Sequence, residues 1–551
     1  MRSVLLFSGP RLGVTLTLLI LTWATSAFGN SLQPISILVW LHPIILLLAY
    51  ERAVQSFQSS ILAHASIIIV QALGTTVAMA GALSYPTTTP LSLLATFTLG
   101  LFLAAATTFG ALLPSFQLLR LTARLLPPSN PTSPSSLPLL GRILLVLPLY
   151  GFPILQTAVT SLTGLLLSHI YDPGVAISDW PALAQLTSLF GLWLLNFLPA
   201  LTASAAHLLL TSEPLPLEPQ PTQSSQLTQP TQTQPTQAQS TTWSRLNRPL
   251  RRHITAVPAL FVLLTAIGGG LVYDGSYYQR PVAAAVASEQ RLAASCVVNE
   301  GARPGSEDYL WIWKVTAERV VAGDHFVLWA EEAVALEGEE QEAALLEAGR
   351  DLLRTHGSPG AGTYLGLTYQ KYLTSNATSR NLNSNSGSSV NNRLPRNKAG
   401  QRAPRQQGYV SGEGGGGGGG SSSNHFVLLG PDGVVVWDYL KAFPVPLVEA
   451  GVVAGPAHLP VADSPYGRLG GAICFDMDQP QYVRQAGAAA VQLMLQPSWT
   501  WGAVGPRHVA SNALRAVENG FTLLRLHACT HAAAAATASA ASSPPAACPT
   551  T

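Results

Sequence analysis

The chain has 551 residues, of which 48% are hydrophobic and only 11% are charged, whereas soluble proteins average about 25% charged residues. The charge is uneven, since 16 of the Asp, Glu, Lys and Arg residues precede Gly275 and 42 follow it. A formal net charge of +2 provides no basic surface of the size that nucleic-acid binding needs. The composition excludes a single water-soluble domain, and it predicts that the first half lies in lipid.

Seven segments of the first half are apolar enough to cross a membrane, which takes about 20 mostly apolar residues. They are 12–29, 35–50, 61–83, 91–113, 143–167, 183–210 and 254–273. Segment 35–50 is short and is open to a re-entrant or tilted reading, and segment 12–29 is open to reading as a cleaved signal peptide. Because no Asp, Glu, Lys or Arg lies inside a span, we do not expect an ion pathway.

The basic residues of this half all fall on one side of the predicted spans. They are Arg2, Arg11, Arg52, Arg120, Arg124, Arg142, Arg245, Arg248, Arg251 and Arg252. Lys and Arg accumulate in cytoplasmic loops, so the amino terminus is expected in the cytoplasm. Seven spans then place the second half on the non-cytoplasmic side of the membrane, in a periplasm or an organelle lumen.

Composition predicts a multi-pass α-helical membrane domain over residues 1–275 and an α/β domain over 276–531. In the second domain, short apolar strands alternate with helical segments, the pattern of layered α/β folds. Three low-complexity stretches are expected to be unstructured. They are a cytoplasmic loop at 213–242, an insertion at 376–423 and an Ala/Ser/Pro tail at 532–551.

Three reactive side chains lie at the ends of predicted strands, where layered sheets place catalytic groups. Glu331 follows Phe-Val-Leu-Trp-Ala, Lys441 follows a run that ends in Asp-Tyr-Leu, and Cys474 follows Gly-Gly-Ala-Ile. Helix-terminus amides and a neighbouring ammonium would favour a nucleophilic thiolate at Cys474. A carboxylate at Glu331 would move protons, and the Lys441 ammonium would stabilise an oxyanion. Together they would suit acyl transfer through a thioester.

Each of these residues also has a purely structural explanation. A cysteine that ends an apolar strand is often part of the core, a glutamate can begin a helix, and a lysine can lie in a solvated loop. Glu332 is an alternative to Glu331 as the base. The four cysteines are scattered without CxxC or CxxH spacing, so neither a zinc site nor a dense disulfide framework is expected.

The chain order Glu331, Lys441, Cys474 resembles the Glu-Lys-Cys triad of the nitrilase, or carbon-nitrogen hydrolase, superfamily. With the apolar spans upstream, the chain resembles the membrane branch of that superfamily, the apolipoprotein N-acyltransferases. The motifs that carry the resemblance are Trp329-Ala330-Glu331, Tyr439-Leu440-Lys441 with Glu449 eight residues after the lysine, Ala472-Ile473-Cys474-Phe475-Asp476, and His508 with Arg515-Ala516-Val517-Glu518-Asn519-Gly520.

The resemblance implies an αββα sandwich behind the membrane domain and a fatty acyl chain carried on Cys474 as a thioester. The donor would be a phospholipid, and the acceptor would be the amino group of a lipidated protein or another amine. Glu331 would be the general base, Glu449 a supporting charge, and Asp476 a residue that orients the nucleophile loop. Trp499 and Trp501 would line the substrate entrance, unless they serve packing. No cofactor, metal or nucleic-acid partner is implied.

The chain departs from this family at two points. Asp476 stands where the family usually has a glutamate, and the sequence ends soon after Arg525, where the family adds further strands and a last span. A truncated sheet is therefore expected. Two alternative functions remain, namely a membrane-tethered carbon-nitrogen hydrolase that passes the acyl group to water and an inactive membrane scaffold with a degenerate nitrilase fold.

Overall fold

The structure of the protein is a computed structural model. It describes residues 10–31, 34–57, 59–79, 90–125, 139–167, 172–211, 241–273, 292–299, 301–356, 362–372, 421–446, 448–449, 451–500 and 504–526. Most of the expected loop at 213–242, most of the insertion at 376–423 and the whole tail at 532–551 lie outside these residues. The chain divides into two units, Met1–Arg280 with Trp501–Gly520, and Pro281–Thr500 with Phe521–Thr551.

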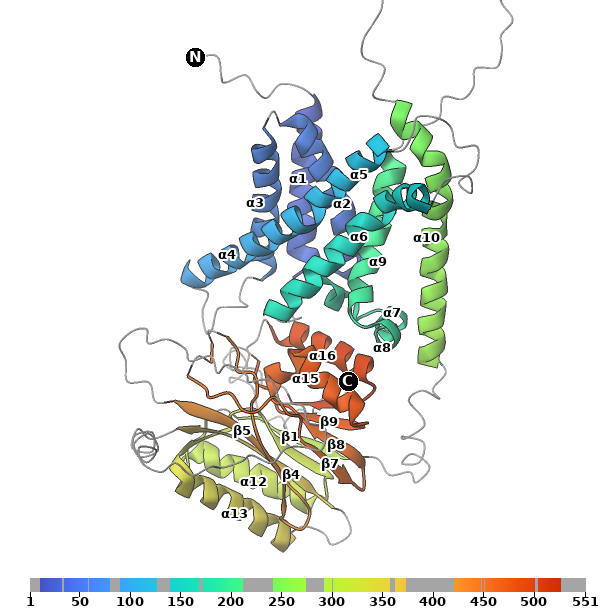
Figure 1. The fold of residues 1–551 in the computed structure, drawn as a ribbon. Coiled ribbons are helices and arrows are strands. Elements are labelled where there is room, and N and C mark those ends of the chain that lie inside the picture. Colours follow the sequence, from blue (N-terminus) through green and yellow to red (C-terminus); the bar gives the residue numbers. More distant parts are fainter. Residues whose placement is uncertain are drawn as a thin grey trace, which may run out of the picture. The chain divides into compact units, whose positions relative to one another are not determined.

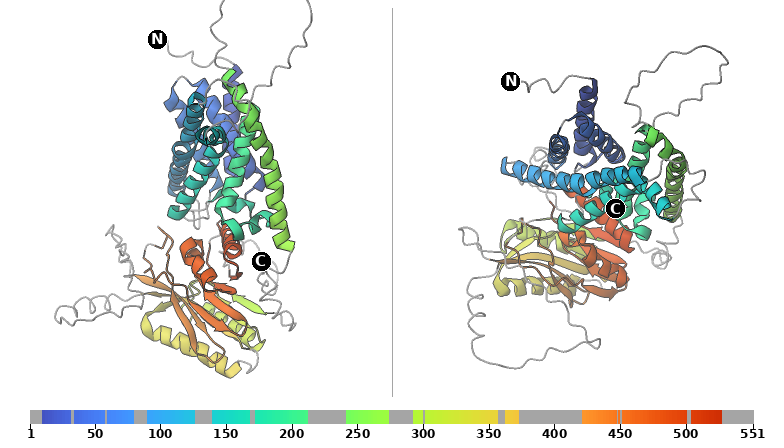
Figure 2. Two further views of the ribbon diagram at one scale, coloured as in Figure 1. Left: turned by 45° about the vertical axis from the view of Figure 1, so that its right-hand side comes forward. Right: turned by 45° about the horizontal axis from the view of Figure 1, so that its top comes forward.

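The first unit consists of helices that pack along one another (Figures 1 and 2). The long helices are α1 (Pro10–Gly29), α2 (Ser36–Ser56), α3 (Ser60–Ala78), α4 (Pro90–Thr107), α5 (Leu113–Leu125), α6 (Leu139–Leu167), α9 (Trp193–Thr211) and α10 (Thr241–Tyr273). The π-helical turn η1 (Thr108–Leu112) joins α4 to α5. Within the described residues, six helices are long and apolar enough to cross a membrane, and α6 is helical over the remaining predicted span, 143–167.

The predicted span 183–210 is interrupted in the structure. A 3-10 helix η4 (Pro173–Ile177) and two short helices, α7 (Pro181–Gln185) and α8 (Thr187–Phe190), precede α9. Helix α8 ends at Gly191, which has φ +76° and donates its N–H to the carbonyl oxygen of Thr187. Glycine adopts a positive φ at little cost, so the chain turns here and the long helix begins only at Trp193.

Helix α16 (Gly505–Asn519) belongs to the first unit by its contacts, although its sequence lies between two strands of the α/β domain. The buried guanidinium of Arg507 donates hydrogen bonds to the main-chain oxygens of Ser31 and Asp172, at 2.9 and 3.0 Å. Leu514 joins a hydrophobic cluster with residues of η4 and α9, including Ile177 and Leu195. Polar and apolar contacts together therefore hold α16 against the helical unit.

The second unit contains two β-sheets. The larger sheet has the order β1 (Ala294–Val297), β2 (Phe326–Trp329), β4 (Tyr364–Tyr372), β5 (Ser422–Leu429), β6 (Val435–Leu440), and β3 (Val334–Glu337) also pairs with β4. The smaller sheet has the order β10 (Thr522–Arg525), β9 (Leu493–Gln496), β8 (Gly467–Gly471), β7 (Val461–Ser464). The hairpins β5–β6 and β7–β8 are antiparallel, whereas β1, β2 and β4 are parallel, as are β8, β9 and β10.

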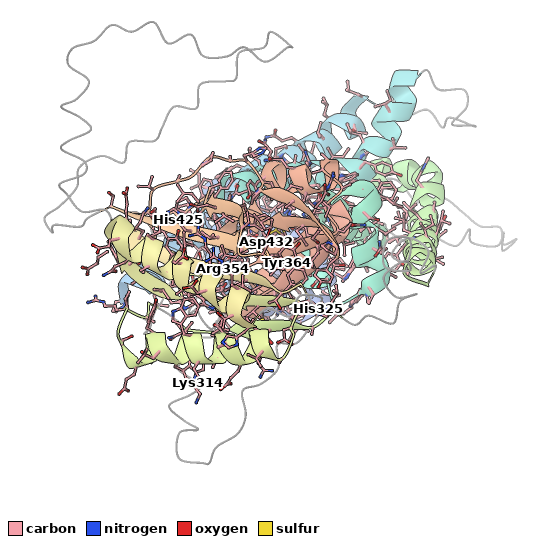
Figure 3. The ribbon with its side chains drawn as sticks, turned by 90° about the horizontal axis from the view of Figure 1, so that it is seen from below. Lys314, His325, Arg354, Tyr364, His425 and Asp432 are labelled. Carbon is pink, nitrogen blue, oxygen red and sulfur yellow. The ribbon has the colours of Figure 1, made fainter. Side chains whose placement is uncertain are left out.

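Helices α12 (Glu307–Val321) and α13 (Gly338–His356) cover one face of the larger sheet (Figure 1). Their inward side chains, such as Ile312 and Leu353, share a hydrophobic core with strand residues such as Leu365. Their outer faces carry exposed charges, among them Lys314 and Arg354 (Figure 3). This amphipathic pattern explains why both helices were predictable from the sequence.

The other face of the larger sheet packs against the smaller sheet. Gly471 on β8 lies so close to the Trp437 ring on β6 that a Cβ atom there would be 3.0 Å from it. Tyr466 packs its ring on Phe326 at a centroid distance of 5.4 Å. Helix α15 (Pro480–Ala488) lies beside the smaller sheet, where the Tyr482 hydroxyl donates to the carbonyl oxygen of Gly471. The unit is therefore a layered α/β fold with two packed sheets.

Candidate active site

The carboxylate of Glu331 and the ammonium of Lys441 form a buried ion pair. Glu331 lies two residues after β2 ends, and Lys441 directly follows β6. Lys441 Nζ donates to Glu331 Oε1 at 2.7 Å and to both carboxylate oxygens of Glu449 at 2.7 and 2.8 Å. Glu331 and Lys441 are each 1% exposed. The structure thus brings Glu331, 110 residues before Lys441, into one buried group of charges with Lys441 and Glu449.

Cys474 lies in the same site, at the start of the 3-10 helix η5 (Cys474–Asp478). Its φ of 43° is in the left-handed region, which non-glycine residues seldom adopt and which is found most often at functional sites. The preceding strand β8 ends at Gly471, so Cys474 follows it at a distance of three residues. Cys474 Sγ donates to the main-chain oxygen of Trp499 at 3.6 Å and lies 3.9 Å from Thr500 Oγ1.

Trp499 connects the thiol to the carboxylate through its main chain. Its N–H donates to Glu331 Oε2 at 2.7 Å, while its carbonyl oxygen accepts from Cys474. Both contacts involve main-chain atoms, so the place of the Trp499 ring at the substrate entrance stays a prediction. Trp501, the second residue of that prediction, lies outside the described residues.

Asp476 links the nucleophile turn to the loop that carries the lysine. Its carboxylate accepts hydrogen bonds from the Ile473 N–H at 2.9 Å, the Phe443 N–H at 2.8 Å and the Tyr439 hydroxyl at 2.8 Å. Tyr439 and Phe443 flank Lys441 in the sequence. The Asp476 carboxylate therefore positions both the nucleophile turn and the loop that carries the lysine. The sequence suggested that Asp476 orients the nucleophile loop, and the structure places it where it contacts both loops.

The charges around Lys441 keep it protonated. Burial alone would lower the pKa of Lys441, but the carboxylates of Glu331 and Glu449 outweigh burial and raise it well above its usual value. Burial raises the pKa of Glu449, and the Lys441 ammonium opposes that shift. A lysine with a raised pKa is a fixed cation rather than a base, which suits it to stabilise negative charge.

The proton state of Cys474 differs from the thiolate that the sequence analysis expected. Burial raises the pKa of Cys474 far above its usual value, and the negative charge of Glu331 raises it further, although Lys441 acts in the opposite direction. The resting residue is therefore a thiol. Its proton must leave during the attack, and Glu331, held beside it by Trp499, is placed to accept it.

Asn424 is a site residue that the sequence analysis missed, because it directly follows the expected insertion 376–423. It lies on β5 and is fully buried. Its Nδ2 donates to Glu331 Oε1 at 3.0 Å and to Glu332 Oε1 at 3.2 Å, and its main-chain oxygen accepts from the Lys441 N–H at 2.9 Å. The Lys441 ammonium donates to Glu331 Oε1 at 2.7 Å, so the geometry favours Glu331 as the base.

Arg525 on β10 is a second residue that was not predicted to serve the site. Its guanidinium donates to Ser498 Oγ at 2.9 Å and to Thr500 Oγ1 at 3.0 Å. Thr500 in turn lies beside the Cys474 sulfur. Arg525 therefore supports one wall of the site from the opposite edge of the smaller sheet.

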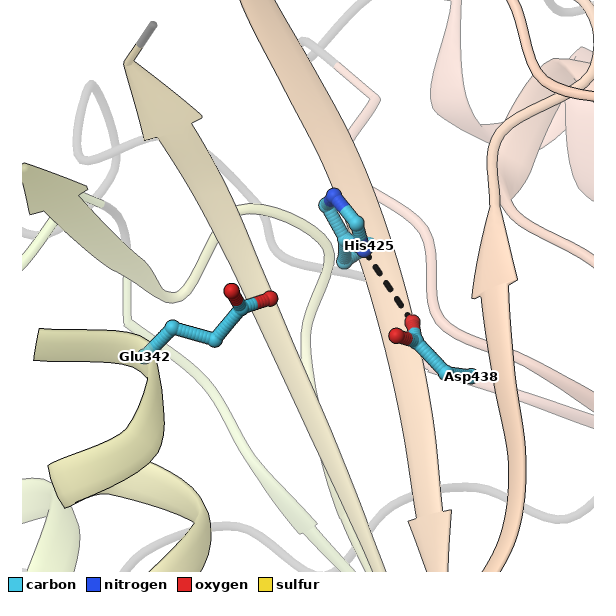
Figure 4. A group of neighbouring side chains, drawn as sticks. All are labelled: Glu342, His425 and Asp438. Atoms are coloured by element: carbon cyan, nitrogen blue, oxygen red, sulfur yellow. Dashed lines mark hydrogen bonds and ion pairs between the residues drawn. The ribbon is translucent and has the colours of Figure 1, made fainter. Parts of the chain in front are cut away.

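One group of described side chains has ligand atoms close enough to hold a metal ion, Glu342, His425 and Asp438, within 4.8 Å of one another (Figure 4). His425 Nδ1 lies 3.1 Å from Asp438 Oδ1. Both oxygens of Glu342 accept hydrogen bonds, from Tyr369 at 2.6 Å and from the Lys371 ammonium at 2.8 Å. Because the ammonium already neutralises Glu342 and would repel a cation, this group fits a hydrogen-bond network better than a metal centre.

Comparisons with known proteins find one family match and similar solved structures. The carbon-nitrogen hydrolase family matches residues 406–533, which include Lys441 and Cys474. The NitN amidase from Nesterenkonia sp. AN1 is similar at 20% identity over 43% of this chain and 79% of its own, with a TM-score of 0.30. Another amidase structure from Nesterenkonia sp. shares 21% identity over 44% of this chain and 78% of its own, also at 0.30.

A comparison with curated protein sequences finds no match. The matched residues extend over parts of both units, and Glu331 precedes them in the sequence. The carboxy-terminal region of the chain therefore contains a segment, residues 406–533, that matches the carbon-nitrogen hydrolase family.

Proposed function

We propose that the protein is a membrane-bound N-acyltransferase that carries a fatty acyl chain on Cys474. The observation that supports this most directly is the Glu331–Lys441 pair at 2.7 Å, linked through Trp499 to a buried thiol. This arrangement supplies a nucleophile, a proton acceptor and a fixed positive charge. Glu449 and Asp476 serve as supporting residues that hold Lys441 and its loop.

In the first step Cys474 Sγ attacks the carbonyl carbon of a phospholipid ester, and Glu331 takes the thiol proton. The carbonyl electron pair moves to the oxygen, and the Lys441 ammonium stabilises the oxyanion. When the tetrahedral intermediate collapses, the ester C–O bond breaks and the leaving alkoxide takes the proton from Glu331. The products are a thioester on Cys474 and a lysophospholipid.

In the second step an amine attacks the thioester carbon. The amine nitrogen gives up a proton to Glu331, and the same proton is returned to the departing Cys474 sulfur. The acyl chain ends as an amide on the acceptor, which we propose to be a lipidated protein or another membrane-bound amine. The free thiol is restored, so Cys474 acts as a catalyst.

The helical unit provides the reason to place both substrates in a membrane. Six helices have the length and hydropathy of membrane spans, and large apolar side chains lie on their outer surfaces, with Ile61 76% and Val262 66% exposed. Apolar outer surfaces of this kind suit contact with lipid. We therefore place the first unit in the bilayer and the catalytic domain on its non-cytoplasmic side.

A second function has support of its own, a membrane-tethered carbon-nitrogen hydrolase. The match to the carbon-nitrogen hydrolase family at residues 406–533 favours it. In that function Cys474 Sγ would attack the carbonyl carbon of an amide, the C–N bond would break, and the departing amine would take the proton from Glu331. Water would then attack the thioester and release a free acid. The two functions therefore differ in the bond that is broken and in what accepts the acyl group.

The test incubates the full-length protein with a phospholipid that has a labelled acyl chain. Hydroxylamine-sensitive label on the wild type is expected, together with its loss in Cys474→Ser. Cys296→Ser is the matched control, because Cys296 lies on β1 away from the ion pair, and it should label normally. Equal labelling of Cys474→Ser would refute the proposal.

A chase separates the alternatives. Transfer of the label to an added lipid-anchored amine supports the acyltransferase, whereas release as free acid at the same rate with and without amine supports the hydrolase. A wild-type protein that neither labels nor cleaves small amides would contradict both and leave the inactive scaffold.

A further inference from the structure

The helical unit contains a partly open cavity with apolar walls and several polar side chains, outside the site of the proposed chemistry. It has a volume of about 120 Å³ and is lined by residues of α1, α2, α3, α4 and α6. Since one water needs roughly 10–15 Å³ of such space, the cavity has room for a group of several heavy atoms. Polar groups among membrane-spanning helices are costly and usually serve a function.

Hydroxyl and amide groups dominate the polar part of the lining. They include Asn30, Gln71, Thr75, Gln156, Thr160 and Thr163. Leu46 and Phe152 add apolar walls. Neutral groups that both donate and accept hydrogen bonds match a ligand that does the same, which is the property of a hydroxyl-rich compound.

Two hydrogen-bond acceptors at this cavity lack protein partners. They are Asn30 Oδ1 and Gln156 Oε1, both of which are buried. The amide nitrogen of Gln156 is already engaged, donating to Thr160 Oγ1 at 3.4 Å. An unpaired buried acceptor costs about 1–3 kcal/mol. Both oxygens are covered by neighbouring atoms, but the terminal amide torsion is soft, and a small rotation would turn them toward a donor in the cavity.

The charge of the lining favours a neutral ligand. No Lys or Arg is found among the described lining residues, and the single carboxylate is Asp172. Asp172 Oδ1 accepts the N–H of Gly174 at 2.8 Å as the cap of η4, and the Arg507 guanidinium binds the main-chain oxygen of Asp172 at 3.0 Å. Because the Asp172 carboxylate already accepts a hydrogen bond and has the Arg507 guanidinium nearby, the cavity does not need a positively charged ligand to balance it.

We propose that this cavity binds the polyhydroxyl head group of a neutral membrane lipid, such as a glycosyl diacylglycerol. The lipid source follows from the apolar outer surfaces of the surrounding helices, which suit a bilayer. Hydroxyl groups of the head group donate to Asn30 and Gln156. They also donate to the threonine hydroxyls, whose own protons already go to main-chain oxygens. The proposal concerns binding by the helical unit alone, so it does not depend on the acyltransferase reaction.

The experiment uses the full-length protein in a detergent that has no sugar head group. Its melting temperature is measured with galactosyl diacylglycerol, with phosphatidylcholine of the same acyl chains, and with free galactose. We expect the melting temperature to rise to a plateau as the galactolipid is added, and to stay unchanged with phosphatidylcholine. If free galactose raises the melting temperature as much as the galactolipid does, the ligand is not specifically a lipid. If both lipids raise it equally, or if neither raises it, the proposed site is wrong.

Gln156→Met removes the acceptor while keeping the size of the side chain, and it should weaken galactolipid binding by about tenfold. The matched control is Gln55→Met, because Gln55 donates to Glu51 at an exposed position on α2 and does not line the cavity. Thr160→Val is a second, nearly isosteric test if Gln156→Met fails to fold. Unchanged affinity in a folded Gln156→Met or Thr160→Val protein would contradict the proposal.

Discussion

Lys441 is held between two carboxylates, and this residue decides whether the site is a catalytic centre. Its ammonium bonds Glu331 and Glu449 at 2.7 Å each. Lys441→Met would leave two buried carboxylates without their cation, and removing one partner of a buried ion pair costs about 3–5 kcal/mol. We expect a large fall in melting temperature and at least a hundredfold loss of thioester formation, measured by thermal unfolding and by labelling.

Lys371→Met is the matched control for this substitution. Lys371 pairs with Glu342 at 2.8 Å on the outer side of the larger sheet, with its side chain 16% exposed. The substitution Lys371→Met should lower the free energy of unfolding by about 1 kcal/mol and leave acyl labelling of the protein intact. If the two variants label equally well, Lys441 has no part in the reaction.

The raised pKa of Asp476 predicts how the stability of the folded protein depends on pH. Burial raises its pKa from 3.8 to about 7, against the opposing effect of Lys441. Between those values the folded protein holds a proton that the unfolded chain has released. The contribution of Asp476 to the free energy of unfolding is therefore full below its unfolded pKa and is lost as the pH rises through about 7.

Asp476→Asn removes that titration. From about pH 5 to about pH 8, the melting temperature of the wild type should fall more steeply than that of Asp476→Asn. The comparison is between the two slopes, because the substitution also weakens hydrogen bonds to Ile473 and Phe443 at every pH. Parallel slopes would show that Asp476 does not titrate in this window.

At the scale of elements, the loop after β6 positions Lys441 through close main-chain packing. The Gly455 N–H donates to the Lys441 carbonyl oxygen at 2.8 Å, and a Cβ atom at Gly455 would lie 2.3 Å from the carbonyl oxygen of Leu440. The main chain cannot move away from such a clash without disturbing its neighbours. Gly455→Ala should therefore destabilise the protein by about 1–3 kcal/mol and slow acyl labelling. Gly451→Ala, with open space around it, should behave as wild type in the same two assays.

The positions of the reactive side chains were predictable because strand ends are visible in the sequence. Glu331 and Lys441 follow the apolar strands β2 and β6 as expected. The strands β3 (Val334–Glu337) and β7 (Val461–Ser464) were not predicted, since each is a short run that ends in charged or polar residues and shows no clear apolar pattern.

Other features of the site could not be predicted, because they depend on tertiary structure. The bridge from Glu331 to Cys474 runs through main-chain atoms of Trp499, and main-chain atoms have no sequence signature. The protonated state of Cys474 results from burial and from the charge of Glu331. Asn424 escaped notice because the low-complexity composition before it masked the start of β5.

At the scale of the whole molecule, the proposal requires the helical unit to be an integral membrane domain. The six candidate spans predict that the full-length protein stays in the membrane pellet after washing at alkaline pH. A protease added to the non-cytoplasmic side of sealed vesicles should cleave the catalytic domain. Protection of that domain, together with cleavage from the cytoplasmic side, would reverse the proposed orientation.

The central claim is that Cys474 carries the acyl chain, and the most direct measurement is mass spectrometry of the acyl-enzyme. Full-length protein is incubated with a phospholipid of defined acyl chains, quenched in acid and digested. The account predicts an acyl adduct of that mass on the peptide that contains Cys474, absent from Cys474→Ser and removed by hydroxylamine. Product formation with Cys474 unmodified, or with the adduct on another residue, would contradict it.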